Sequence, residues 1–292
     1  MMPKASSTSS TEQSISNVVK ELLVRINSFG TESAPRGQKV RELELEMLRL
    51  DPNFAVMDFP ARPFNWKYFM GELGWYLLKD NNIDFINNFS SFWKNLAGEG
   101  GNINSNYGAL LFGPQLQWAL DSLKKDKNTR QAVCFVNQSK FQYEGNKDFV
   151  CTMYLNFWIR DNKLNMKVQM RSNDIFYGLS YDAPFFAFVQ QSMWHWLSNT
   201  YPELGLGTYY HCADNIHYYE RHFDLAEKII SEETGEAHWF HLRAPLFNLN
   251  NGIMLPSVEG LRFMESLSIL MKQETITQEE SKELLQTYFY IQ

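Results

Sequence analysis

The hydrophobic pattern changes its period in the middle of the chain, and this change limits the possible folds more than any other feature. Residues 132–136, 154–159 and 164–170 are rich in β-branched and aromatic side chains, which is typical of strands. Asp161-Asn162 lies between the last two segments and favours a hairpin turn. Apolar residues on both sides of this region recur at helical spacing instead. The sequence therefore predicts an α/β (α+β) fold, with helices packed on a β-sheet.

The segments outside the middle region carry the three-to-four-residue spacing of amphipathic helices. Val18, Leu22 and Ile26 predict the first helix, which Gly30 can end. Loops are predicted over residues 98–107 and around Pro202, Gly205 and Gly207, and an extended segment over residues 242–249. Further helices are predicted over residues 66–77, 116–123, 187–197, 223–230 and 261–271, and from Thr277, where Glu280 completes a capping box.

The chain of 292 residues is long enough for one large domain or two small ones. It shows no internal repeat and no linker, so we expect a polar tail over residues 1–14 and a single domain over residues 15–292. The formal net charge of -6, without a basic tract, argues against a general coating of nucleic acid. No apolar run approaches the roughly 20 residues of a membrane span, and the 3 scattered cysteines indicate a reducing compartment. We therefore expect a cytoplasmic protein.

The cysteines differ in their setting. Cys134 and Cys212 lie in strand-like or mixed segments, so both are expected to be structural thiols. Cys151 stands where the polar loop 145–148 meets the next strand. Such a junction is a favourable position for a nucleophile, because a rigid strand and access to solvent coincide there. Cys151 is therefore the candidate catalytic thiol.

Cys151 belongs to a series of short motifs that follow one another in a fixed order. They are Pro35-Arg36-Gly37, Gly71-Glu72-Leu73-Gly74-Trp75-Tyr76, Asn128-Thr129-Arg130, Asp148-Phe149-Val150-Cys151-Thr152, Arg171-Ser172-Asn173-Asp174, Gly178-Leu179-Ser180-Tyr181-Asp182 and Asn215-Ile216-His217-Tyr218-Tyr219. This order resembles the thymidylate synthase superfamily, over residues 20–230. The resemblance implies a large mixed β-sheet flanked by helices, with one face of the sheet used for dimerisation.

The resemblance also implies chemistry at C5 of a pyrimidine nucleotide, with 5,10-methylenetetrahydrofolate as co-substrate and no metal. C5 is a poor nucleophile until a group adds at C6, and a thiolate suits that addition because it attacks and leaves readily. Cys151 is then the nucleophile, and Glu72 holds water and relays protons around the ring. Tyr107 and Asp174 are expected to assist near the thiol and the base.

The nucleotide is expected to be held through its phosphate and its sugar. Guanidinium groups suit a phosphate because they make paired, charge-assisted hydrogen bonds. In the superfamily one arginine region reaches across to the partner subunit, so Arg130 implies a homodimer; Gln131 follows it where two adjacent arginines are common. The resemblance assigns Arg36, Arg130 and Arg171 to the 5′-phosphate and His217 and Tyr219 to the sugar 3′-hydroxyl. It also places Ser172 among the substrate-binding residues.

Asp182 indicates which base is used. Thymidylate synthases have asparagine at this position, which can donate to uracil O4 and accept from N3–H. Cytosine presents an N4 donor and an N3 acceptor, so a carboxyl that shares a proton with the base favours cytosine. Thr152 also replaces the histidine that follows the nucleophile in the synthases, and the motifs around it most resemble the phage deoxycytidylate hydroxymethylases. We therefore expect dCMP as substrate and 5-hydroxymethyl-dCMP as product, made in the host cytoplasm for DNA modification if the chain is phage-encoded.

The final step of the reaction is open at this point. Residues 288–292 do not resemble the synthase tail that closes over folate and excludes water, so a looser or different lid favours water addition. Hydride transfer would instead give 5-methyl-dCMP, and an enzyme directed to dUMP is a further alternative.

Two alternatives from other classes are weaker. A non-catalytic relative that binds a nucleotide or RNA would have no reason to keep the thiol, the carboxylate and the arginine of the motifs together. A metal site from His211, Cys212 and His217 lacks a second set of ligands. The expected partners are thus dCMP, folate and a second copy of the chain, without a membrane or an obligatory nucleic acid.

Overall fold

The computed structural model describes residues 14–231 and 235–292, so the tail expected over residues 1–14 lies outside the described residues except for Ser14. Ser14 is buried and accepts a hydrogen bond from the backbone N–H of Asn17, so it belongs to the first helix as its N-cap. That residues 15–292 form a single catalytic domain stays a prediction. The helices are α1 (Ile15–Phe29), α2 (Trp66–Leu78), α3 (Tyr107–Leu111), α4 (Pro114–Lys125), α5 (Ser180–Ser198), α6 (Phe223–Ser231), α7 (Val258–Leu270) and α8 (Gln278–Tyr288).

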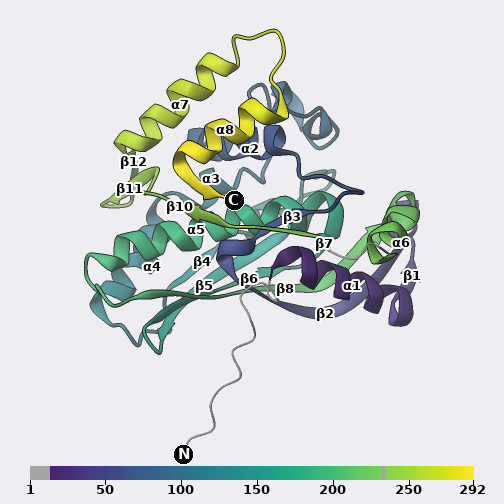
Figure 1. The fold of residues 1–292 in the computed structure, drawn as a ribbon, viewed down its shortest axis with the longest axis horizontal. Helices are drawn as coiled ribbons and strands as arrows, with labels where there is room; N and C mark the ends of the chain where they lie inside the picture. The colour runs from purple at the N-terminus through teal and green to yellow at the C-terminus, as the bar shows by residue number, and fades with distance from the viewer. Residues whose placement is uncertain (1–13, 232–234) are drawn as a thin grey trace, which may run out of the picture.

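A mixed sheet forms the base of the fold (Figure 1). Its strand order is β1-β2-β8-β6-β5-β4, and β7 pairs with β8 off this path. β8 runs parallel to β6 and β7 and antiparallel to β2. The large mixed sheet predicted above is thereby confirmed. The strands are β1 (Thr31–Ser33), β2 (Val40–Leu50), β3 (Val56–Asp58), β4 (Val133–Phe135), β5 (Thr152–Arg160), β6 (Lys163–Met170), β7 (Asn173–Asp174), β8 (Gly205–Tyr219), β9 (Glu236–His238), β10 (Phe240–Leu242), β11 (Phe247–Asn250), β12 (Ile253–Pro256) and β13 (Phe289–Ile291).

The hairpin predicted between β5 and β6 is present. Asp161 and Asn162 both have positive φ, 51° and 55°, as a two-residue turn that follows the twist of its strands requires. The loop predicted at Gly205 and Gly207 is wrong, because both residues belong to β8. A Cβ atom at Gly207 would lie 2.5 Å from Oδ1 of Asn165, so this glycine permits close pairing with β6 and does not mark a turn.

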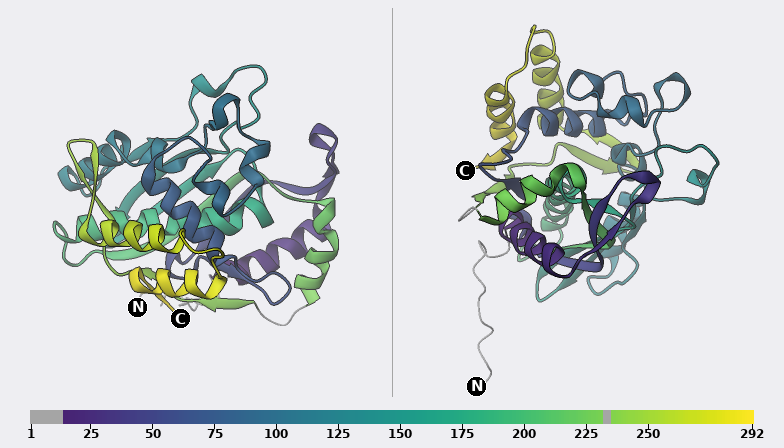
Figure 2. Two further views of the ribbon diagram at one scale, coloured as in Figure 1. Left: turned by 90° about the horizontal axis from the view of Figure 1, so that it is seen from above. Right: turned by 90° about the vertical axis from the view of Figure 1, so that its right-hand side faces the viewer.

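The helices lie on one side of the sheet, as Figures 1 and 2 show. α5 is buried along most of its length between the sheet and the C-terminal segments, and it places its first turn at the end of β7. In the described part of the chain no helix covers the opposite face of the sheet (Figure 1). Leu45, Met47 and Phe135 are exposed on strands of this sheet or at a bulge in them, at 81%, 58% and 62%. The sheet therefore has one face packed in the core and one with apolar residues in solvent.

The C-terminal residues are part of the core. β13 pairs antiparallel with β10, and Phe289 is fully buried with its ring stacked 4.6 Å from that of Phe240. The extended segment expected over residues 242–249 is interrupted, because β10 ends at Leu242 and β11 begins at Phe247. The residues expected to form a looser or different lid thus end α8 and form β13, in which Phe289 and Ile291 are buried and Tyr290 is 45% exposed. Their role as a lid stays a prediction.

The contact between α2 and α3 leaves no room for a side chain at Gly108. A Cβ atom there would lie 1.7 Å from the carbonyl oxygen of Tyr76. We predict that Gly108→Ala lowers the free energy of unfolding by about 3 kcal/mol, because the two helices must separate. Urea unfolding followed by circular dichroism measures this. Gly98→Ala is the control, since its Cβ would meet only the Asn102 carbonyl oxygen at 3.6 Å; equal stability losses in both variants would contradict the prediction.

Candidate active site

Cys151 lies directly before β5, and its sulfur contacts a fixed arginine. Nη2 of Arg171 is 3.4 Å from Sγ, and the same guanidinium donates to the carbonyl oxygens of Phe149 and Val150. Its carbon centre lies 4.7 Å from the centroid of the Phe149 ring. The carbonyl groups of the loop before Cys151 thus fix the Arg171 side chain, and Arg171 in turn stabilises the loop.

Burial and nearby charges act on the Cys151 thiol in opposite directions. Burial raises its pKa most strongly, Arg171 and Arg36 lower it, and the carboxyls of Asp182 and Asp148 raise it, with a net increase. The arginine does favour the thiolate, but burial outweighs it. In the free protein at neutral pH the sulfur is therefore mainly a thiol.

Asp148 fastens the loop before Cys151 to the loop before α3. Its Oδ2 accepts hydrogen bonds from the backbone N–H groups of Asn104 (2.6 Å) and Ser105 (2.8 Å), and its Oδ1 accepts one from the Ser105 hydroxyl (2.6 Å). Asp148 is 7% exposed. A carboxylate with three donors in the interior is a strong structural clamp. It fixes Cys151 relative to Tyr107, which begins α3.

Glu72 lies on α2 with its carboxyl in the interior, at 5% exposure. The Tyr68 hydroxyl donates a hydrogen bond to its Oε1 at 2.7 Å, and the Tyr76 hydroxyl contributes another. Burial raises the pKa of Glu72 to about 8, and the nearby carboxyl of Asp182 acts in the same direction. Glu72 is therefore a carboxyl that is mainly protonated at neutral pH, which suits a group that exchanges protons with a substrate.

Tyr107 is buried between the thiol segment and α5. It hydrogen-bonds Thr152, the residue after the nucleophile, and its ring lies 5.6 Å from the ring of Tyr76. Burial raises the pKa of its phenol well above the ordinary value, and the charges of Asp182 and Cys151 add to the increase. The structure thus brings Tyr107 beside both the thiol and the Asp182 carboxyl.

Asp182 lies in the first turn of α5, behind a π-helical turn over Ile175–Leu179. Its Oδ2 accepts a hydrogen bond from Nδ2 of Asn173 at 2.8 Å. Burial raises the pKa of Asp182 to about 7, although the Asn173 donor lowers it. Because its charge also acts on Glu72, Tyr107 and Cys151, these four groups surround one place in the fold.

The remaining cluster around the thiol comes from the β1–β2 turn and from the ends of β7 and β8. Arg36 has a left-handed conformation, φ 54°. Burial raises the pKa values of Cys151 and Tyr219, and the charge of Arg36 opposes both increases. The rings of His217 and Tyr219 are 5.3 Å apart, and His217 Nδ1 lies 2.9 Å from Oδ1 of Asn215. Of the residues expected from the sequence to bind phosphate and sugar, Arg36, His217 and Tyr219 therefore lie in one cluster.

Asp174 has a structural task that the sequence did not indicate. Its Oδ1 accepts hydrogen bonds from the backbone N–H groups of Phe176 and Tyr177, both at 2.7 Å, and so caps the π-helical turn. Its Oδ2 is buried without a partner among the described residues. Burial lowers the pKa of His217, which the charge of Asp174 opposes, and burial raises the pKa of Tyr219, to which the same charge adds. Asp174 thus both holds the turn before Asp182 and keeps one acceptor oxygen unused.

Two of the predicted substrate-binding residues have fewer contacts. Ser172 follows Arg171 directly and is partly exposed. Arg130 is exposed in the connection between α4 and β4, and within residues 14–231 and 235–292 no hydrogen bond or ion pair links it to another site residue. The structure does not bring Arg130 to the thiol of its own chain.

Arg62 is not among the residues expected from the sequence. Its Nη2 donates to the Phe176 carbonyl and, at 3.2 Å, to the Ser180 hydroxyl, and its guanidinium lies 5.8 Å from the Tyr181 ring. Nη1 is buried without a partner in the described part of the chain. Because its partners are more than a hundred residues away in the sequence, no local pattern points to it.

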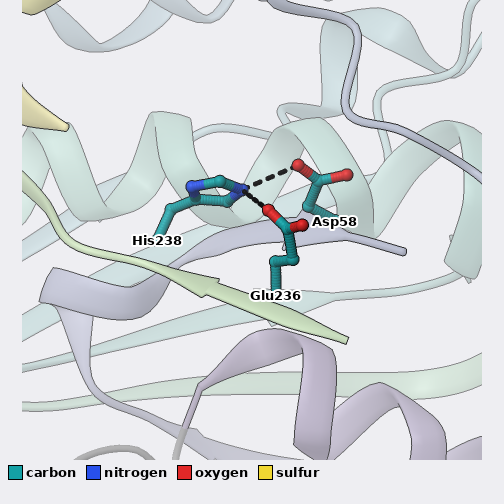
Figure 3. A group of neighbouring side chains, drawn as sticks. All are labelled: Asp58, Glu236 and His238. Carbon is teal, nitrogen blue, oxygen red and sulfur yellow. Dashed lines mark hydrogen bonds and ion pairs between the residues drawn. The ribbon is translucent and has the colours of Figure 1, made fainter. Parts of the chain in front are cut away.

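The metal site considered from the sequence does not form. His211 and Cys212 are neighbours on β8 and so point to opposite faces of the sheet, and burial lowers the pKa of His211 to about 3. A different group of potential ligands lies at the β3–β9 pair (Figure 3), where Nε2 of His238 is 2.7 Å from Oδ2 of Asp58 and 3.4 Å from Oε2 of Glu236. Oδ1 of Asp58 also accepts a hydrogen bond from the backbone N–H of Phe64. These side chains therefore stabilise the β3–β9 pair, outside the thiol site.

Comparison with known proteins decides the family. The family model for thymidylate synthase matches residues 18–251. The chain belongs to the thymidylate synthase family. A solved structure, thermostable thymidylate synthase A from Bacillus subtilis, superposes with a TM-score of 0.63 at 20% identity and covers 77% of this chain and 87% of that one. The thymidylate synthase fold is thus confirmed, and β12, α7, α8 and β13 lie beyond the matched segment.

The curated relatives are phage enzymes. Deoxycytidylate 5-hydroxymethyltransferase from Enterobacteria phage T6 is 30% identical over 185 residues, which is 60% of this chain and 74% of that protein. The enzyme of the same name from Enterobacteria phage T4 is 29% identical over the same length. Deoxyuridylate hydroxymethyltransferase from Bacillus phage SP01 is 27% identical over 224 residues, 70% of this chain and 55% of that protein. Both names describe hydroxymethyl transfer, and they differ in the base.

Family membership fixes the general chemistry. Thymidylate synthases are one-carbon transferases that bind a nucleotide and use methylenetetrahydrofolate as co-substrate. A helix capable of crossing a membrane is not found among the described residues. The substrate, the product and the roles of single residues are proposals.

Proposed function

We propose that the protein transfers a one-carbon unit from 5,10-methylenetetrahydrofolate to C5 of dCMP and, with water, forms 5-hydroxymethyl-dCMP. The observation that carries this proposal is Asp182, a partly buried carboxyl whose pKa desolvation raises to about 7, in the same cluster as Cys151. A carboxyl that holds one proton at neutral pH offers one donor and one acceptor to the edge of a base.

The covalent steps follow from the nucleophile. The Cys151 sulfur bonds to C6, and the electron pair of the C5–C6 double bond moves to C5, which bonds to the one-carbon unit. Loss of the C5 proton and release of tetrahydrofolate leave an exocyclic methylene. Water then adds to this methylene, and the sulfur leaves C6. Glu72, mainly protonated before the reaction, supplies and recovers protons at the ring through water.

The charges around the thiol support a nucleotide as substrate. Arg36 and Arg171 both act on Cys151, so a 5′-phosphate near them would lie within one nucleotide's length of the sulfur. Ser172 adds a hydroxyl beside Arg171, and His217 with Tyr219 offers hydrogen bonds to the sugar. Asp174 and Tyr107 hold the segments that carry the base-binding and thiol residues.

Analysis of the product tests the function. The purified protein is incubated with dCMP or dUMP and 5,10-methylenetetrahydrofolate, and the nucleotide is examined by mass spectrometry. We expect a gain of CH2O on dCMP and no absorbance change from dihydrofolate. A gain of CH2 with dihydrofolate would support the second candidate, a methylating enzyme. Turnover of dUMP in preference to dCMP would overturn the base assignment, and no covalent product from either would favour a binding protein.

Removal of the Asp182 carboxyl should abolish the base preference. An alanine side chain neither accepts from the cytosine amino group nor donates to N3, and it no longer opposes O4 and N3–H of uracil. Each buried unpaired polar group costs about 1–3 kcal/mol, so we predict that Asp182→Ala lowers the kcat/KM ratio of dCMP to dUMP by roughly 100-fold or more. Steady-state kinetics with both nucleotides measure the ratio. Asp148→Asn, at the other carboxyl near the thiol, should lower stability without changing the ratio, and an unchanged ratio in Asp182→Ala would refute the assignment.

A homodimer is part of the proposal. The uncovered face of the sheet exposes Leu45, Met47 and Phe135, and burial of such residues favours association. Arg130 is exposed and is not engaged at its own thiol, which fits a role at the partner's site. If so, a mixture of the Arg130→Ala and Cys151→Ala proteins regains activity that neither has alone. A monomer in sedimentation experiments would rule this out.

A further inference from the structure

A chain of buried hydrogen bonds runs from β8 to the Asp182 carboxyl. The Tyr209 hydroxyl is 2.7 Å from Nδ1 of His211, and Nε2 of His211 is 3.0 Å from Oδ1 of Asn173. Nδ2 of Asn173 is 2.8 Å from Oδ2 of Asp182. Tyr209 and His211 are fully buried and Asn173 is 3% exposed. These three side chains have almost no access to water, so they must satisfy one another and the partly buried Asp182 carboxyl. Their donors and acceptors are therefore strictly ordered.

The direction of this chain is set at Tyr209. Among the described residues, His211 Nδ1 is the partner of its buried hydroxyl, and a buried O–H that fails to donate costs free energy. The hydroxyl therefore donates, and Nδ1 accepts. His211 is neutral, since burial lowers its pKa to about 3, so its single ring proton lies on Nε2. Nε2–H donates to Oδ1 of Asn173, which leaves the Asn173 N–H to donate to Asp182.

The consequence for Asp182 is a fixed position for its proton. Oδ2 accepts the amide N–H of Asn173, and a protonated carboxyl oxygen is a poor acceptor. The proton that Asp182 holds near neutral pH therefore belongs on Oδ1. Oδ2 of the carboxyl is then an acceptor and Oδ1 a donor. The two oxygens cannot swap these roles while His211 fixes the orientation of the Asn173 amide.

We propose that Tyr209, His211 and Asn173 are positioning residues that fix the proton of Asp182 on Oδ1 and so select cytosine over uracil. With Oδ2 toward the exocyclic group, the cytosine amino group meets an acceptor and N3 meets a donor. Uracil would bring O4 against an acceptor and N3–H against a donor. A carboxyl free to move its proton to Oδ2 would accept uracil as well, so the carboxyl alone does not discriminate. This inference rests on the proposed function, because it assumes that a pyrimidine edge faces Asp182.

The test compares kcat/KM for dCMP and dUMP in variants of His211 and Tyr209, the hydrogen-bonded residues farthest from Asp182. In His211→Leu, Asn173 can turn over and present its oxygen to Asp182, so we expect the kcat/KM ratio of dCMP to dUMP to fall roughly 10- to 100-fold. His211→Gln keeps an amide N–H for Asn173 and an acceptor for Tyr209, and should restore the ratio to within about threefold of the unaltered protein. Tyr209→Phe removes only the hydroxyl and should lower the ratio by about 3- to 10-fold.

A matched control separates selection from stability. His195 is another partly buried histidine, bonded at 2.9 Å to the Leu242 carbonyl at the other end of α5, and His195→Leu should lower the melting temperature without changing the ratio. If His211→Leu and Tyr209→Phe also lose only stability, the residues are structural and the proposal is overturned. A ratio that moves further toward dCMP in these variants would overturn it too.

Equilibrium binding keeps this inference distinct from the proposed function. The same variants are made in the Cys151→Ala protein, and dCMP and dUMP are titrated without folate. The protein with Cys151 intact could form no product while binding prefers dCMP and loses that preference in His211→Leu. This result would refute the proposed function and support the proposed role of the positioning residues. If hydroxymethyl-dCMP forms but the ratio of the dissociation constants of dCMP and dUMP is the same in all variants, the proposed function is supported. The proposed role of the positioning residues is then refuted.

Discussion

Replacement of Cys151 by alanine should lower kcat/KM by at least about 10⁴-fold and leave nucleotide affinity within a few-fold. Without the sulfur no bond forms at C6, and C5 stays too weak a nucleophile to take the one-carbon unit, so the largest share of the rate enhancement is lost. Arg36 and Arg171 still hold the phosphate, because the backbone contacts of Arg171 and the turn that carries Arg36 do not depend on the thiol. A loss in kcat with an unchanged dissociation constant is therefore the expected signature.

Cys134→Ala is the matched control. Cys134 is fully buried on β4, its thiol donates to the Gln115 carbonyl at 3.4 Å, and burial raises its pKa to about 12. It should keep its activity and lose some stability. A covalent adduct gives a second readout: 5-fluoro-dCMP and methylenetetrahydrofolate should add their mass to the unaltered protein and to Cys134→Ala, but not to Cys151→Ala. An adduct on Cys151→Ala, or activity in it, would remove Cys151 from the mechanism.

The structure also changes what activates this thiol. An arginine beside a thiol favours the thiolate, and Nη2 of Arg171 lies 3.4 Å from the sulfur. Burial nevertheless raises the pKa of Cys151 overall, because the carboxyls of Asp182 and Asp148 add to desolvation. Neutralisation of the Asp182 charge by its proton weakens that opposition. The protonation state of Asp182, the proposed base-binding residue, thus affects the pKa of Cys151, the proposed nucleophile.

Local patterns predicted the parts of the fold that local chemistry determines. The β5–β6 hairpin follows from Asp161-Asn162, and α8 begins at Thr277 with both hydrogen bonds of the expected capping box. β2 could not be predicted in this way, because its sequence VRELELEMLRL consists largely of helix-favouring residues. It is a strand because it pairs along almost its whole length with β8, which lies about 170 residues further along the chain.

The residues of the candidate site also fall into two groups, those that local motifs predict and those that depend on strand pairing. Cys151, Arg171 and Asp182 belong to contiguous motifs, so a resemblance could find them, and the structure brings them together. Tyr209 and His211 belong to none of these motifs, and their contact with Asn173 depends on the parallel pairing of β7 and β8. A histidine in a strand gives no sign of its partner until the strands are paired. Tyr209 and His211, whose contacts lead to Asp182 through Asn173, are therefore residues that sequence reasoning missed.

Replacement of Glu72 by glutamine should lower kcat by roughly 10²- to 10⁴-fold, the usual contribution of a positioned acid or base. The glutamine side chain would keep both tyrosine contacts, since an amide oxygen also accepts from the hydroxyls of Tyr68 and Tyr76; what the substitution removes is the proton. Burial raises the pKa of Glu72 to about 8, so the protonated form that serves the addition step prevails at neutral pH. The Asp182 proton is lost near pH 7 in both proteins, and the unaltered enzyme should lose further activity as the pH rises through about 8. The variant should lack this second fall.

Stability gives an independent readout with a defined sign. Because the folded-state pKa of Glu72, about 8, exceeds the ordinary value of 4.5, the folded protein binds more protons than the unfolded chain between these values. The free energy of unfolding contributed by this group is then fully present below pH 4.5 and declines as the pH rises through about 8. Glu72→Gln escapes the decline, so its melting temperature relative to the unaltered protein should be higher at about pH 9 than at about pH 5.

Glu280→Gln is the control for this sign. The Thr277 side chain and backbone donate to the Glu280 carboxyl and lower its pKa, so its contribution is present at neutral pH and is lost on acidification. Its variant should keep full activity and show the opposite trend, with its stability deficit largest at neutral and alkaline pH. If Glu72→Gln instead loses stability at about pH 9 while its kcat stays normal, the carboxyl is ionised in the folded protein and serves the fold. A lower kcat together with the alkaline gain in stability requires a buried, protonated Glu72 that acts on the substrate.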